Sequence, residues 1–160
     1  MTKKTFTLDF REEYNFLLLG VFCSYRDYKL CTELNKKLDL RFERIEDLEL
    51  KLEKKGSTGL FAIFHFMNQD EEHYFLISNK GSNGLFVPEL KQVDYFIMIK
   101  EFSRDTKQEE LSKQISDIKI VSSVMEIEPG KLKSADNFLI VDYSEKEHSL
   151  TVSDIRKFKK

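Results

Sequence analysis

The longest apolar run in the chain spans residues 16–23 and is only eight residues long. A helix that crosses a bilayer needs about 20 apolar residues, so this run cannot span a membrane. It is rich in Leu, Val and Phe on both faces, which is typical of a fully buried strand, with a short helix as the competing interpretation. Residues 15–22 are therefore predicted to form a central strand of a sheet.

The composition favours one folded domain without a strong net charge. The chain has 160 residues, of which 41% are hydrophobic, including 14 Phe and 6 Tyr. A chain of this length buries roughly 70% of its unfolded surface, enough for a core that needs no metal or disulfide. Its 26 basic residues nearly balance its 28 acidic ones. Nucleic-acid binding is therefore disfavoured, and no membrane association is expected.

The two cysteines and the charged N-terminal residues indicate a cytoplasmic protein. Cys23 and Cys31 have neither CxxC nor zinc-knuckle spacing, so two reduced, packed thiols are expected, with a disulfide or redox pair as the alternative. Asp9, Arg11 and Glu12 interrupt any apolar segment of an export signal.

Two amphipathic helices are predicted. Ser24 is expected to cap the first, over residues 25–38, with Asp27 as its capping-box partner. Asp105 is expected to cap the second, with Gln108 at the reciprocal position. Apolar residues recur every three or four positions on one face of each helix: Tyr28, Cys31, Leu34 and Leu38 in the first, and Leu111, Ile115 and Ile118 in the second.

Segments with a period of two, or apolar on both faces, predict the strands. They cover residues 6–10, 15–22, 40–43, 48–52, 60–67, 73–78, 93–100 and 120–127. Segments 60–67 and 73–78 are expected to pair as a hairpin around the polar turn 68–72. Phe61, Phe64 and Phe66 lie on both faces of one strand, which favours a sheet covered by helices on one side and by a partner on the other.

These elements predict an α+β fold with a mainly antiparallel sheet and both helices on one face. Two strand–helix–strand units flank the hairpins, an element order that resembles ferredoxin-like or ligand-binding regulatory domains. Residues 1–130 are expected to form a single domain. Residues 131–160 would be a C-terminal extension, with a hairpin of segments 138–143 and 150–152 and a basic tail at 156–160.

One motif resembles a known family signature. Residues 87–95, Val-Pro-Glu-Leu-Lys-Gln-Val-Asp-Tyr, are similar to the signature of the IPExxxVDY family of bacterial proteins, with Val87 in place of the first Ile. Similar patterns at 27–30, 34–36 and 47–50 extend the resemblance over most of residues 5–130. The family carries no established activity, so the resemblance implies no substrate, cofactor or catalytic residue.

The motif residues have a structural interpretation. Pro88 fixes its own φ, holds Val87 extended, and suits the first position of a helical turn that Glu89 would stabilise. Asp94 could accept backbone N–H groups, and Tyr95 could bury its ring with its hydroxyl bonded.

In this interpretation Val93 and Tyr95 share one face of the following strand. The functional alternative places Glu89, Asp94 and Tyr95 at one cleft beside the 81–84 loop, for ligand binding or acid–base chemistry.

Weaker signals have structural explanations. His65 and His73 are expected to meet across the hairpin, but a metal would need further ligands and His148 is distant in sequence. The 81–84 loop lacks the following helix that a phosphate-binding loop requires, so a turn is expected. The aromatic strand lacks the basic and glycine residues of RNA-binding sheets.

The leading hypothesis is a non-enzymatic binding or interaction module without a cofactor or metal. Its partner would be a second copy, through a sheet edge or apolar sheet face, or another cytoplasmic protein. The alternatives are a small-molecule-binding regulatory domain, an enzyme using Glu89, Asp94 or Tyr95, and a weak RNA-binding protein that uses basic patches.

Overall fold

The computed structural model describes residues 14–52, 56–102 and 107–146, with side chains to residue 141 in the last helix. The predicted strand at 6–10, the predicted cap Asp105, the strand at 150–152 and the basic tail lie outside these ranges.

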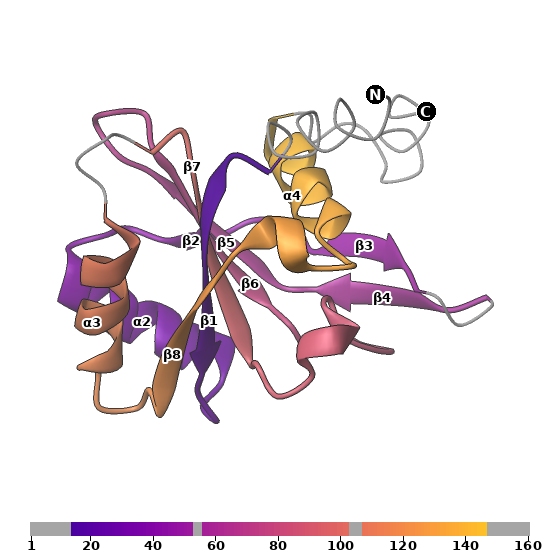
Figure 1. Ribbon diagram of the computed structural model, residues 1–160, viewed down its shortest axis with the longest axis horizontal. Helices are drawn as coiled ribbons and strands as arrows, with labels where there is room; N and C mark the ends of the chain where they lie inside the picture. The colour runs from indigo at the N-terminus through magenta and orange to yellow at the C-terminus, as the bar shows by residue number, and fades with distance from the viewer. Residues whose placement is uncertain (1–13, 53–55, 103–106, 147–160) are drawn as a thin grey trace.

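A six-stranded antiparallel sheet forms the centre of the structure, with the strand order β2-β5-β6-β7-β1-β8 (Figure 1). Its strands are β1 (Phe16–Phe22), β2 (Glu43–Arg44), β5 (Ile63–Met67), β6 (His73–Ser78), β7 (Tyr95–Lys100) and β8 (Ser123–Ile127). β1 lies between β7 and β8 and pairs antiparallel with both. The long apolar run is thus an interior strand, and the α+β class with an antiparallel sheet is confirmed.

Both predicted helices cover one face of this sheet. They are α2 (Asp27–Leu38) and α3 (Gln108–Ser116), which contact each other at the left of Figure 1. Leu30, Leu34 and Ile115 pack from the helices into a cluster with Leu19 and Ile97 of the sheet. An amphipathic helix is stabilised mainly by this kind of burial rather than by its propensity.

The predicted capping box at the start of α2 is wrong. Arg26 is the N-cap residue, and its side chain makes no capping hydrogen bond. Asp27 accepts the backbone N–H of Tyr28 instead, at 2.7 Å. Ser24 is exposed and lies two residues before the helix cap.

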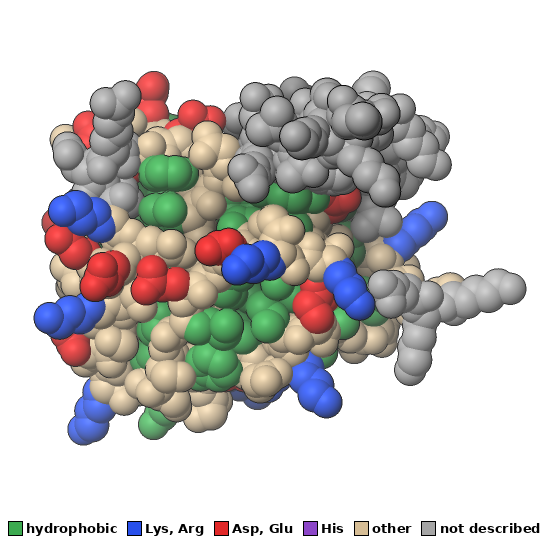
Figure 2. Space-filling model, in the orientation of Figure 1, with side chains coloured by type: hydrophobic (Ala, Val, Ile, Leu, Met, Phe, Trp, Pro, Cys, Tyr) green, Lys and Arg blue, Asp and Glu red, His purple; other side chains and the backbone are tan. Residues whose placement is uncertain are grey.

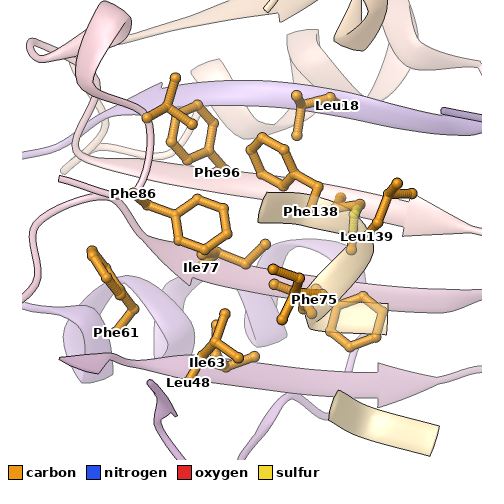
Figure 3. Close-up of a cluster of buried hydrophobic side chains, with 14 of the residues drawn as sticks. Leu18, Leu48, Phe61, Ile63, Phe75, Ile77, Phe86, Phe96, Phe138 and Leu139 are labelled. Atoms are coloured by element: carbon orange, nitrogen blue, oxygen red, sulfur yellow. The ribbon is translucent and has the colours of Figure 1, made fainter. Parts of the chain in front are cut away.

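The opposite face of the sheet is covered by the chain itself. A two-stranded sheet of β3 (Leu48–Lys51) and β4 (Thr58–Phe61) and the helix α4 (Asp136–Lys146) enclose a second cluster. The Phe138 ring lies 5.0 Å from Phe86 and 5.3 Å from Phe96 between ring centroids, both edge-on. Figure 3 shows these rings together between the layers. The side on which a partner was expected is therefore part of the core.

Three strand predictions differ from the structure. Residues 40–43 were predicted as a strand, but β2 begins only at Glu43. Residues 60–67 form two strands, because β4 pairs with β3 while β5 pairs with β2 and β6. Residues 138–143 were predicted as a strand and lie in α4. Four consecutive residues of α4, Phe138 to Val141, are buried, so the helix is apolar around its whole circumference there and shows no helical period.

Replacing Phe138 by Ala is expected to lower the free energy of unfolding by about 3–5 kcal/mol, because it leaves a cavity among three aromatic rings. Urea denaturation followed by circular dichroism measures the loss. Leu60→Ala is the control, because that side chain is 48% exposed. A loss below about 1 kcal/mol for Phe138→Ala would mean that α4 does not dock as described.

Candidate functional site

The motif forms a short turn that leads into β7. Val87 is buried and extended, and Pro88 is the first residue of η1 (Pro88–Leu90), a 3-10 helix of one turn. The N–H of Val93 donates to the carbonyl of Leu90 at 3.0 Å and closes the next turn. The predicted proline-started helical turn is confirmed.

A buried asparagine at the end of β6 holds this turn. Asn79 is fully buried, and its Nδ2 donates to the carbonyls of Leu90 at 3.0 Å and Val93 at 2.8 Å. Its Oδ1 accepts the N–H of Val87 at 2.7 Å. An Asn in a run of Asn, Lys, Gly and Ser is typical of an exposed turn, so no sequence signal distinguishes this one.

Glu89 connects the motif to the chain that enters α4. Its two oxygens accept the backbone N–H and the hydroxyl of Ser134, each at 2.8 Å. Burial alone would raise the pKa of Glu89, but hydrogen bonds from the backbone N–H groups of Glu89, Ser134 and Lys133 and from the Ser134 hydroxyl lower it below its ordinary value. The carboxylate therefore has a structural role.

Asp94 joins three segments at the other end of the motif. Its Oδ2 accepts the backbone N–H of Cys23 at 2.8 Å, and its Oδ1 lies 2.9 Å from Nζ of Lys80. The carboxylate thus accepts a backbone N–H, as the structural interpretation predicts, but from the segment after β1.

Tyr95 is buried against the helix-covered face, and its hydroxyl donates to the carbonyl of Tyr25 at 2.6 Å. Burial first, and then the negative charge of Asp27, raise the pKa of Tyr95 well above its ordinary range. Val93 packs in the other cluster, so the prediction that Val93 and Tyr95 share a face is wrong. The strand begins only at Tyr95, and the turn before it breaks the alternation.

A hollow of about 290 Å³ lies where β1 leads into α2. Its lining combines the segment 23–26 with side chains from the ends of β6 and β7: Cys23, Ser24, Tyr25, Arg26, Ser78, Lys80, Asp94 and Tyr95. Glu89 is not part of this lining, because it faces Ser134 instead. The structure therefore brings Asp94 and Tyr95 together but does not add Glu89 to them.

The 81–84 loop is not part of the hollow either. It folds over β4, where the N–H of Ser82 donates to Leu60 and the amide of Asn83 donates to Thr58. Gly81 allows this approach, because a Cβ there would lie 2.8 Å from the Leu60 carbonyl oxygen. The expected turn is confirmed, and several of its donors are satisfied within the chain.

Two exposed aromatic side chains lie within and just after the segment 23–26 that lines the hollow. Tyr25 is 50% exposed and Tyr28 is 64% exposed, on either side of the exposed Arg26. Arg26 makes no ion pair and no side-chain hydrogen bond with any residue of the described ranges. We call Tyr25, Arg26 and Tyr28 the tyrosine rim.

The two histidines of the hairpin meet as expected. His65 Nε2 lies 2.8 Å from His73 Nδ1, and the rings stack with centroids 5.1 Å apart. Within residues 14–52, 56–102 and 107–146, no group of three or more His, Cys, Asp or Glu side chains could hold a metal ion. His148 lies outside the described residues.

Asn79→Ala is expected to lower the free energy of unfolding by about 3 kcal/mol, because it leaves the buried Val87 N–H and Val93 carbonyl without a partner and removes one of two hydrogen bonds to the Leu90 carbonyl. Thermal and urea denaturation would measure the loss. Asn83→Ala removes one exposed bond to Thr58 and is expected to cost less than about 1 kcal/mol. Equal losses for the two variants would contradict the assignment.

Glu89→Gln removes the negative charge that accepts the two hydrogen bonds from Ser134, and the effect on the free energy of unfolding should depend on pH. Because the folded-state pKa of Glu89 is lowered, its contribution to stability is present above its unfolded pKa and is lost as pH falls through the folded pKa. The stability advantage of the wild type over Glu89→Gln should therefore be constant at neutral pH and decrease as the pH falls below about 4.3, the ordinary pKa of Glu. Urea denaturation from pH 3 to pH 7 measures it, and a pH-independent difference would contradict the prediction.

Comparisons with known proteins found no match among family models, curated proteins or solved structures. The resemblance to the IPExxxVDY signature therefore depends on residues 87–95 and its accompanying patterns, and stays a prediction. In the described part of the chain, no helix combines the length and apolarity needed to cross a bilayer.

Proposed function

We propose that this protein is a non-enzymatic binding module that holds a protein partner on the tyrosine rim and the adjoining hollow. The observation that carries the proposal is the exposure of two neighbouring tyrosines, 50% and 64%, on either side of an exposed arginine. Tyr and Arg are the residues most often found as anchors at protein interfaces. We also propose membership of the IPExxxVDY family and a bacterial cytoplasmic location, the latter on two buried free thiols.

The chemistry of the hollow supports binding over catalysis. Both oxygens of Asp94 are already engaged, by Cys23 N–H and by Lys80. Burial raises the pKa of the Cys23 thiol and that of the Tyr95 hydroxyl, so neither group is activated as a nucleophile or base.

The charges of the hollow indicate what the partner presents. Lys80 is neutralised by Asp94, whereas Arg26 has no acidic partner among the described side chains. A carboxylate on the partner would pair with Arg26, and a volume of about 290 Å³ accepts one of its side chains. On the face shown in Figure 2, acidic and basic side chains are intermixed, which gives no support to RNA binding there.

A small anionic molecule in the same hollow is the second candidate. Ser24 and Arg26 line it with donors, as a regulatory ligand site would require. Its volume is at the lower limit of ligand pockets, about 300–1,000 Å³, which favours the protein partner.

Tyr28→Ala and Arg26→Ala are each expected to weaken partner binding at least tenfold, because both truncate an anchor without touching the core. The partner would be isolated with the tagged wild-type chain from its source cells, and its Kd measured by calorimetry. Leu60→Ala is the matched control, since Leu60 is also an exposed large apolar side chain, at 48%, and lies on β4.

Three outcomes contradict the proposal. They are a strict monomer without protein partners in pulldown and sedimentation, equal weakening by Leu60→Ala, and unchanged binding in both rim variants. A thermal shift with small anions that requires Arg26, in the absence of any protein partner, would select the second candidate. A sedimentation equilibrium that shifts with concentration and weakens in Tyr28→Ala would identify the partner as a second copy.

A further inference from the structure

The histidine pair sits on a rigid hairpin in the central sheet. His65 lies opposite Phe75, and Met67 lies opposite His73, in the register of β5 and β6. Side chains two residues apart on a strand, and directly opposite across a pair, point to the same face. His65, His73 and Met67 therefore share one face of the hairpin end, where Met67 is 50% exposed.

We propose that His65, His73 and Met67 together bind one cuprous ion at this end of the hairpin. The proposal is independent of the tyrosine rim, which uses other residues and the opposite ends of the strands.

The two imidazole nitrogens are already close to the separation that a shared metal needs. His65 Nε2 and His73 Nδ1 are 2.8 Å apart. With metal–nitrogen bonds of about 2.0 Å, two nitrogens on one ion lie about 2.8 Å apart at a right angle and about 3.5 Å apart in a trigonal site. Small side-chain rotations are therefore sufficient. Phe75 packs on both rings, at 4.9 Å from His65 and 6.4 Å from His73 between centroids, and limits their alternative positions.

Metal binding needs no oxidant and no net proton release from the neutral pair. The hydrogen bond holds one proton between two nitrogens, and the ion takes its place. That proton moves through water to the outer nitrogen of the same ring, so both imidazoles remain neutral ligands.

A thioether as the third ligand selects a soft ion. Directly opposed Cβ atoms lie about 4.5–5.5 Å apart, within reach of the flexible methionine side chain. Imidazole suits copper and zinc alike, but a thioether favours Cu(I). Zinc would want a fourth protein ligand, and no cluster of three His, Cys, Asp or Glu side chains exists in the described ranges.

The surrounding charges admit a cation. Lys100 of β7 lies opposite His73 and places a positive charge in the same row. Its Nζ lies over the Phe16 ring, 5.7 Å from the centroid, so that charge is directed toward β1. The carboxylates of Asp70, Glu71 and Glu72, just before His73, outnumber it. The preference for Cu(I) therefore depends on the thioether and not on charge.

The full-length protein would be titrated anaerobically with Cu(I) in competition with a chromophoric chelator. One ion per chain is expected, with at least 100-fold weaker binding in His73→Gln and His65→Gln and at least tenfold weaker binding in Met67→Leu. Met125→Leu on β8, half-buried and away from the hairpin, is the control and should bind as the wild type does.

Imidazole ¹⁵N resonances provide a readout that folding defects would not mimic, because Cu(I) is diamagnetic. The resonances of His65 and His73 should shift together on addition of one equivalent. Circular dichroism would show that each variant remains folded.

Stoichiometric Cu(I) binding that persists in the His73→Gln variant would assign the ion to other ligands, such as the cysteines, and overturn the proposal. Zinc binding as tight as that of Cu(I) and insensitive to Met67→Leu would overturn it as well, as would the absence of Cu(I) binding to the wild type.

Discussion

The structure depends on the side-chain amide of Asn79, which replaces water for the backbone around the buried segment that leads into the η1 turn. Phe86 and Val87 are completely buried, so the backbone beside them needs internal hydrogen-bond partners. Asn79 supplies three such bonds through its side chain, and its own carbonyl accepts the N–H of Phe86 at 2.8 Å. Because an unpaired buried polar group costs about 1–3 kcal/mol, this one amide decides whether Phe86 and Val87 can enter the core.

The turn matters because it joins the layers of the molecule. The Phe86 ring lies edge-on to Phe61 of the small sheet, at 5.4 Å, and to Phe138 of α4, at 5.0 Å. The Asn137 amide donates to the carbonyl of Phe86 at 2.8 Å. Glu89 binds Ser134 on the same path into α4. One buried loop therefore connects the large sheet, the small sheet and the last helix.

The sequence predicts well what local periodicity determines. The interior strand β1 and the hairpin of β5 and β6 are confirmed because each shows a clear period or length limit. The predicted buried face of α2 is confirmed at Cys31 and Leu34 but is wrong at Tyr28, which is 64% exposed. The sequence does not predict helix α4, since Phe138 to Val141 are all buried and their pattern shows no helical period. The role of Asn79 is not predicted for a different reason. Its partners lie eight to fourteen residues away, and only the tertiary structure brings them to its side chain.

Two motif residues hydrogen-bond the backbone of the segment that carries the proposed binding surface. Asp94 fixes the backbone N–H of Cys23, and the Tyr95 hydroxyl fixes the carbonyl of Tyr25 at 2.6 Å. The segment that carries the tyrosine rim is thus held at two points by motif residues whose polar atoms face inward. A surface held in this way loses less conformational entropy when a partner binds. Asp94 and Tyr95 would then contribute to the proposed recognition through the position of Tyr25 and Arg26, and need not contact the partner themselves.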